Sequence, residues 1–82
     1  MYKAEVFVTL KNGILDPQGN AVLRGLESLD IEGVKDVRVG KYLEVSFEAD
    51  NRELAEKKIE LMSSKLLANM VIEDYRFTLT EV

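Results

Sequence analysis

The chain has 82 residues, a net charge of −4 at neutral pH and 46% hydrophobic residues, and it contains neither cysteine nor histidine. A chain of this length forms one small domain, residues 1–82, with a thin hydrophobic core. The absence of cysteine excludes disulfides and thiolate metal sites, and the absence of histidine excludes Ser-His and Cys-His nucleophilic catalysis. Oligomerisation is then the usual remaining source of additional burial.

The acidic balance argues against nucleic acid or an anionic membrane as the main partner, since both require a basic surface. No stretch approaches the ~18 consecutive apolar residues of a membrane-spanning helix. The N-terminus carries Lys3 and Glu5 within an alternating run, which is not the pattern of a signal peptide. We therefore expect a cytoplasmic protein.

The first predicted element is a strand. Residues 2–10 alternate between an apolar and a mostly polar face, which is typical of a strand with one buried face. Phe7 is the exception, because it lies on the polar face. The following loop contains Gly13, which permits a backbone conformation with positive φ.

The next element is a helix. Asp16 is placed to cap it, Pro17 fits its first helical position, and the pattern extends to about residue 29. Gly25 weakens the helix interior, and close approach of the helix to the sheet is the expected compensation. Leu23 lies off the apolar stripe, at the flank of the core or in a partner contact. The stripe itself consists of Val22, Leu26 and Leu29.

A hairpin is predicted from residues 34–39 and 42–49. Val37 and Val39 point inward from the shorter strand, and Gly40-Lys41 supplies a tight turn with glycine at its first central position. The inward side chains of the longer strand are Leu43, Val45, Phe47 and Ala49.

The second helix is predicted to begin after a cap at Asp50 or Asn51 and to end near Asn69, because asparagine tolerates a left-handed cap. Leu54 and Leu61 lie to one side of its apolar stripe, at the core edge or in a subunit interface. The stripe consists of Ala55, Ile59, Met62 and Leu66.

Residues 71–80 form the last strand, so the element order is strand, helix, strand, strand, helix, strand. This is the order of an α+β, ferredoxin-like βαββαβ fold: a four-stranded antiparallel sheet with both helices on one face. The open face should place Phe7 beside Tyr42. We expect oligomerisation through this face or through the edge strands, residues 34–39 and 71–80.

RNA recognition on this fold relies on aromatic side chains of the central strands, where Phe7 and Tyr42 lie. Glu5, Glu44 and Glu48 share that face, and their charge opposes RNA binding. The sequence therefore argues against an RNA-binding module.

Other functions of the fold make different demands on the first loop. A metal chaperone needs cysteines there, and acyl-phosphate hydrolysis needs an arginine, whereas only Lys11 is present. Glu73 and Asp74 are neighbours in a strand and point to opposite faces, so they are not a paired-carboxylate site. A loop with Gly13 and Asp16 permits a ligand site between two subunits, and an enzyme using carboxylates is the remaining alternative.

Three stretches resemble the signature sequences of the PurS family, the small subunit of the multi-subunit phosphoribosylformylglycinamidine synthase. They are residues 15–19 (Leu-Asp-Pro-Gln-Gly), residues 37–41 (Val-Arg-Val-Gly-Lys) and residues 66–75 (Leu-Leu-Ala-Asn-Met-Val-Ile-Glu-Asp-Tyr). The resemblance covers essentially the whole chain, in order and at matching spacing. Asn12 and Met70 depart from it, because the family commonly has proline at these positions.

The resemblance implies a non-catalytic assembly subunit in de novo purine biosynthesis. The complex makes formylglycinamidine ribonucleotide from formylglycinamide ribonucleotide, glutamine and ATP. The synthetase subunit, PurL, uses ATP and Mg, and the glutaminase subunit, PurQ, releases ammonia. This chain would bind no cofactor, pair with itself as a dimer or tetramer, and bridge the other two subunits to support ammonia transfer. The competing interpretation is a homodimeric, small-molecule-binding regulatory domain of the same fold.

The resemblance also nominates candidate residues for contacts with partner subunits, in place of catalytic, cofactor-binding or metal-binding residues. These candidates are Asp16, Pro17, Gln18, Gly19, Arg38, Gly40, Lys41, Asn69 and Tyr75.

Overall fold

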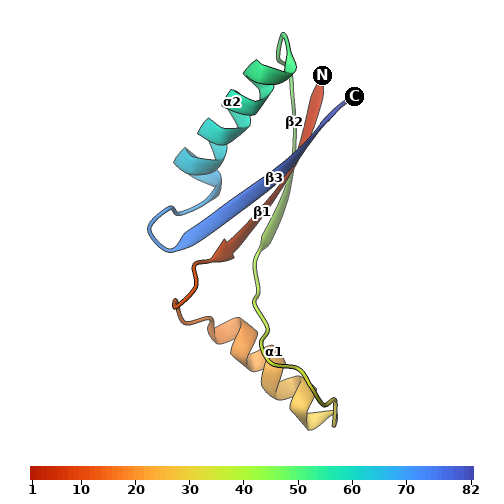
Figure 1. Cartoon of the computed structure of the whole chain (residues 1–82), viewed down its shortest axis with the longest axis vertical. Coiled ribbons are helices and arrows are strands. Elements are labelled where there is room, and N and C mark those ends of the chain that lie inside the picture. The colour runs from red at the N-terminus through yellow and green to blue at the C-terminus, as the bar shows by residue number, and fades with distance from the viewer.

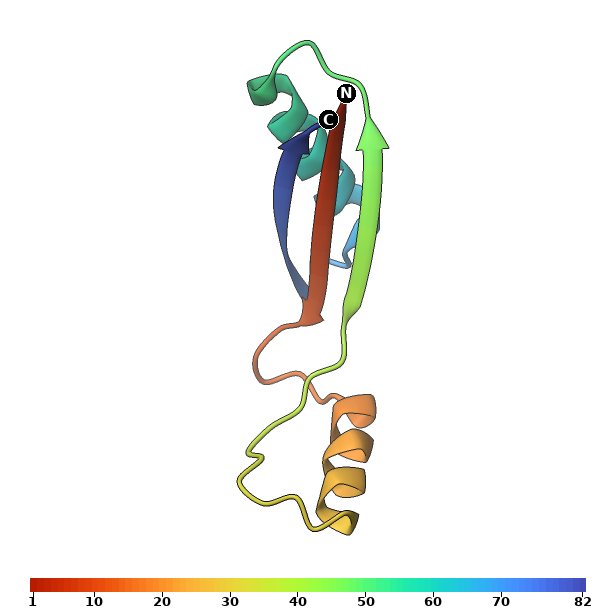
Figure 2. The same ribbon diagram turned by 90° about the vertical axis from the view of Figure 1, so that its right-hand side faces the viewer.

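The computed structural model describes residues 1–82 (Figure 1). Its elements are β1 (Tyr2–Leu10), α1 (Pro17–Ser28), β2 (Lys41–Phe47), α2 (Arg52–Met62), the π-helical turn η1 (Ser63–Leu67) and β3 (Glu73–Glu81). The radius of gyration is 16.2 Å, whereas a compact domain of this length has about 12 Å. The excess arises because residues 11–40, here called the arm, project beyond one end of the sheet (Figure 2).

The sheet has three antiparallel strands in the order β2-β1-β3. Val6 at the centre of β1 lies opposite Leu43 on β2 and Phe77 on β3. The alternation predicted for residues 2–10 is confirmed, because every second side chain of β1 enters the core. The buried core comprises Tyr2, Ala4, Val6, Val8, Ala55, Ile59, Ala68 and Leu79.

Helix α2 covers the core face of the sheet. Its N-cap is Asn51, one of the two predicted caps, whose Oδ1 accepts a hydrogen bond from Leu54 N at 2.9 Å. Ala55 and Ile59 follow on the buried face, as the apolar stripe predicts.

The end of this helix departs from the prediction. Ala68 N donates to Ser63 O at 2.9 Å, a bond across five residues that widens the last turn into a π-helix. The wider turn shifts the buried stripe, so that Ser63 is fully buried while Leu66 is 83% exposed. The prediction that Leu66 belongs to the core stripe is therefore wrong.

The predicted strand at residues 34–39 is also absent, so the single chain has three strands rather than four. Gly40 makes no turn; the chain passes from the arm into β2 without reversing direction (Figure 2). Residues 32–39 consequently make no backbone–backbone hydrogen bond. A strand requires a paired neighbour, and this segment has none within its own chain.

Helix α1 lies in the arm, away from the sheet, so the two helices do not share a face of the sheet in the single chain (Figure 1). An added Cβ at Gly25 meets nothing within 4 Å, so the expected approach of this glycine to the sheet is wrong. Val22 and Leu29 of the apolar stripe are exposed, and Leu23 is half-buried. The helix thus presents an apolar stripe without a partner in its own chain.

Candidate functional site

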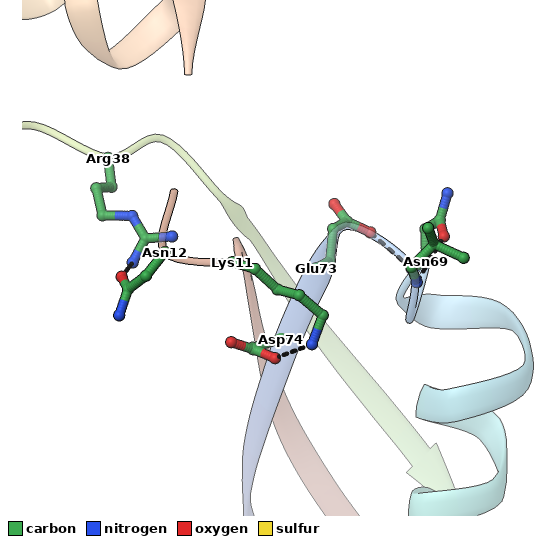
Figure 3. A network of polar contacts seen from close by, with 7 residues as sticks. Lys11, Asn12, Arg38, Asn69, Glu73 and Asp74 are labelled. Atoms are coloured by element: carbon green, nitrogen blue, oxygen red, sulfur yellow. Dashed lines mark hydrogen bonds and ion pairs between the residues drawn. The ribbon is translucent and has the colours of Figure 1, made fainter. Parts of the chain in front are cut away.

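The three signature stretches meet where the arm leaves the sheet, a region called here the junction. Figure 3 shows side chains from three segments of it: Lys11 and Asn12 follow β1, Arg38 precedes β2, and Asn69 and Glu73 lie before and at the start of β3. A shallow groove of about 330 Å³ runs along the junction. Its lining residues are Leu10, Asp16, Pro17, Gln18, Val39, Gly40, Lys41 and Glu73.

Asp16 joins the two ends of the arm. Its Oδ1 accepts a hydrogen bond from Gly19 N at 2.9 Å, which confirms the predicted N-cap of α1, and its Oδ2 accepts one from Val39 N at 2.8 Å. These backbone donors, that of Gly19 first and that of Val39 next, hold the pKa of the Asp16 carboxyl below its usual range. The carboxylate therefore fixes the start of α1 against the end of the returning segment.

Two glycines of the junction are required by close backbone approach. An added Cβ would lie 2.1 Å from Val37 O at Gly19 and 2.2 Å from Val8 O at Gly40. Positive φ occurs at Gly13, as predicted, but not at Gly40. Glycine is thus needed at position 40 because the backbone passes close to β1, and the hairpin turn that the sequence predicts is not formed.

Polar side chains link the junction across its surface. Lys11 Nζ lies 2.7 Å from Asp74 Oδ1, and Lys41 Nζ lies 3.8 Å from Glu73 Oε2. Arg38 Nη1 donates to Asn12 Oδ1 at 3.2 Å. Exposed ion pairs contribute about 0–1 kcal/mol each, so these contacts orient the surface more than they stabilise it.

Asn69 shapes the turn before β3. Its carbonyl oxygen accepts hydrogen bonds from Ile72 N at 3.1 Å and Glu73 N at 2.7 Å. Its side chain accepts from Val71 N, and its own N–H donates to Glu73 Oε1 at 2.7 Å. The predicted left-handed cap is wrong, because Asn69 does not adopt a positive φ; the residue acts through its hydrogen bonds.

The structure thus divides the candidate partner residues into two groups. Asp16, Gly19, Gly40 and Asn69 are engaged within the chain, and Tyr75 is half-buried against the core. The side chains that remain on the surface of the junction are Pro17, Gln18, Arg38 and Lys41.

The open face of the sheet brings Phe7 and Tyr42 together, as predicted, with ring centroids 5.2 Å apart. Arg76 places its guanidinium carbon 4.2 Å from the centroid of Phe7, a stacking contact that the sequence did not reveal. Tyr42 donates its hydroxyl to Glu5 Oε2 at 2.6 Å, and this bond raises the pKa of Tyr42 to about 12. These contacts fix the positions of the aromatic rings on this face, while Tyr42 remains 51% exposed.

A second surface lies between α2 and the end of β2. It is a groove of about 620 Å³, called here the α2 groove, and Leu54 and Leu61 contribute exposed apolar side chains to it. The sequence offered a subunit interface as one interpretation of these two leucines. The lining also includes Met1, Glu48, Ala49, Asp50, Lys57 and Lys58.

No group of three or more acidic side chains lies close enough to hold a metal ion. The most perturbed carboxylate, Asp16, uses both oxygens on backbone N–H groups. No helix has the length and apolar character needed to cross a membrane.

Comparison with known proteins gives one consistent result. The profile of the family PurS, phosphoribosylformylglycinamidine (FGAM) synthase, matches residues 3–81. The PurS subunit of this synthase from Bacillus subtilis (strain 168) is 50% identical over 82 residues, which cover 100% of this chain and 96% of the relative. The subunit from Synechocystis is 44% identical over 79 residues, 96% of this chain and 79% of that relative.

Solved structures agree with the sequence matches. Bacillus subtilis PurS superimposes with a TM-score of 0.86 at 49% identity, covering 99% of this chain and 100% of that chain. Methanocaldococcus jannaschii PurS, described as one of the subunits of formylglycinamide ribonucleotide amidotransferase, gives 0.88 at 39% identity, covering 100% and 99%. A chain of the PurLQS structure from Thermotoga maritima gives 0.88 at 29% identity, covering 96% of both chains. The chain belongs to the PurS family of phosphoribosylformylglycinamidine synthase subunits.

Proposed function

We propose that this chain is the non-catalytic assembly subunit of phosphoribosylformylglycinamidine synthase, acting in purine biosynthesis with PurL and PurQ. The observation that carries the proposal is the junction, where the signature residues Asp16, Gly19 and Gly40 hold backbone together. The Thermotoga maritima PurLQS structure, which contains a similar chain, supports the same role.

A bridging subunit has a clear physical purpose in such a complex. Ammonia released at one site must reach another without being lost to water, and fixing two subunits in register shields its route. An elongated chain with exposed surfaces at both ends, 51 Å in its longest dimension, suits a spacer better than a compact enzyme.

We also infer that two copies of the chain pair by exchanging arms. Backbone hydrogen bonds join Lys11 to Ile72 and Met1 to Val82, so the odd-numbered residues of β1 bond to β3. Because successive residues of a strand bond to opposite sides, the even-numbered residues of β1 bond to β2. The backbone groups of Tyr42, Glu44 and Ser46 therefore face the free edge of β2. This edge can accept a strand from a second copy.

The arm supplies a strand of matching character. Residues 32–39 lack backbone–backbone hydrogen bonds, and Val39 N–H is directed toward Asp16, on the side of β1. The opposite side of the segment is left free. Val37 and Val39 continue the alternation of Leu43 and Val45, so their side chains fall on the core face when the segment pairs with β2 of another copy. The fourth strand of a ferredoxin-like sheet would then come from the partner.

Helix α1 of the exchanged arm would pack in the α2 groove of the other copy. In a ferredoxin-like layer, α1 lies beside α2 on the core face, and this position is the vacant α2 groove with Leu54 and Leu61. The exposed stripe of α1, including Val22 and Leu29, has the complementary apolar character. Burying both would remove these exposed apolar side chains from water.

Sedimentation analysis of this chain with PurL and PurQ, with and without Mg-ATP and glutamine, tests the proposal. A complex containing all three subunits is expected. If the isolated chain binds a small metabolite saturably and joins neither subunit, the competing regulatory-domain interpretation replaces this one.

A further inference from the structure

The outer edge of β3 is unpaired and defines a second strand-binding surface. Lys11 N donates to Ile72 O and Val82 N donates to Met1 O, both at 2.8 Å, which sets the hydrogen-bonded pairs between β1 and β3. Because such pairs alternate in antiparallel strands, the backbone groups of Tyr75 and Phe77 point away from the sheet.

This edge is open over a limited length. At one end, Arg52 Nη2 donates to Leu79 O at 3.0 Å and covers the edge. At the other end, Glu73 N is already bonded to Asn69 O at 2.7 Å. The carbonyl of Glu73 and the N–H and carbonyl groups of Tyr75 and Phe77 remain free to form hydrogen bonds. This length of edge fits a short extended segment.

Exposed apolar side chains lie in the segment of the chain that leads into this edge strand. Leu66 is 83% exposed, Val71 is 81% exposed and Met70 is 43% exposed. The π-helical turn moves Leu66 out of the core stripe, and the Asn69 turn places Met70 and Val71 on the surface immediately before β3. Leu66 and Val71 therefore lie largely in solvent, where large apolar groups are costly.

We propose that an extended segment of another synthase subunit adds to the β3 edge as an additional strand, with apolar side chains against Leu66, Met70 and Val71. Side chains on its other face meet Asp74 and Arg76, so polar residues are expected there. The binding segment thus alternates apolar and polar residues. This proposal rests on the proposed function, because it assigns the surface through which the chain joins the rest of the complex.

A heterologous segment suits this edge better than a second copy. In the proposed arm exchange, self-association uses the arms and the β2 edge, and β2 and β3 lie on opposite sides of β1. The two interfaces are therefore free to form at once, which is what a bridging subunit requires.

Two variants test the surface. Val71→Lys changes an exposed apolar side chain and should leave the fold intact. Tyr75→Pro removes an outward N–H that bonds to nothing within the chain, and proline is tolerated at an edge strand in this orientation. It also removes an aromatic ring packed against the core, so it is compared only if its circular dichroism spectrum matches that of the unaltered chain. Val82→Lys is the matched control, because it makes the same change at an exposed valine that lies beyond the open part of the edge and outside the exchanged surfaces.

The readouts are the circular dichroism spectrum, the mass of the isolated chain by light scattering, and its affinity for PurL and for PurQ. Val71→Lys and Tyr75→Pro should weaken binding to one of these subunits about tenfold or more while the isolated chain keeps its mass. Unchanged affinity of well-folded Val71→Lys would overturn the proposal, and so would a reduced mass, which would mean that a second copy occupies the edge. If the unaltered chain binds neither subunit, the proposed function itself fails.

Discussion

Asp16 Oδ2 accepts a hydrogen bond from Val39 N at 2.8 Å across 23 positions of the chain, while the other oxygen of the same carboxylate caps α1. One side chain therefore determines how the returning segment of the arm lies against the helix that precedes it. The bond holds the two ends of the arm together beside the sheet.

Replacing Asp16 with alanine should loosen the arm without unfolding the sheet, because the core of β1, β2, β3 and α2 does not involve this residue. We expect amide hydrogen exchange at Val39 and Gly19 to accelerate about tenfold, with β1 amides little changed. Asp36→Ala is the matched control, since Asp36 is exposed and makes no hydrogen bond or ion pair. Equal exchange at Val39 in both variants would contradict the role of Asp16.

The same contact predicts sensitivity to acid. The pKa of Asp16 is lowered in the folded chain, so its stabilising contribution is fully present above the unfolded value of about 4 and is lost as the pH falls through the lower folded value. Amide resonances of Gly19 and Val39 should therefore titrate together below about pH 4. In Asp16→Asn that titration should be absent; its persistence would assign it to another carboxylate.

Alanine substitutions at three glycines should distinguish two effects on the free energy of unfolding, steric overlap with nearby backbone and helix propensity. Gly19→Ala and Gly40→Ala force a Cβ to within 2.1 Å and 2.2 Å of a carbonyl oxygen, and overpacking of this kind costs about 1–3 kcal/mol or more. Gly25→Ala meets no atom within 4 Å and should favour the helix by roughly 1 kcal/mol within the chain itself. Urea denaturation measures all three, and a tolerated Gly40→Ala would show that β2 can move away from Val8.

Arm exchange predicts that the isolated chain sediments as a multiple of its 9.3 kDa mass. Leu29→Lys on α1 and Leu61→Lys in the α2 groove should each weaken self-association about tenfold or more, because a charge would be buried in an apolar contact. Val71→Lys serves as the control, since it lies outside the exchanged surfaces. Self-association that resists both leucine variants would rule out this mode of pairing.

The sequence was a good guide wherever the interaction is local. The alternation of residues 2–10, the Asp16-Pro17 helix start and the proximity of Phe7 to Tyr42 depend on neighbours in the chain or on one strand pairing. Residues 34–39 misled because Val37 and Val39 alternate in the same way whether the pairing strand belongs to the same molecule or to another.

The other errors have similar causes. Gly40 satisfies the requirements both of a tight turn and of close approach to Val8 O, so the residue type cannot distinguish them. Leu66 lies outside the core stripe because a π-helical turn changes the number of residues per turn. The pattern of apolar residues in the sequence does not reveal such a turn. The side chains that close the junction, such as Lys11 with Asp74, are 63 positions apart and became visible only in the fold.

The most direct measurement of the assembly role is the synthase activity of PurL and PurQ from the same organism with and without this chain, using glutamine or ammonia as the nitrogen source. The account predicts that the chain raises glutamine-dependent turnover strongly and ammonia-dependent turnover much less, because it couples the two sites and performs no chemistry. Full glutamine-dependent turnover in its absence, or an equal effect on both nitrogen sources, would contradict the account.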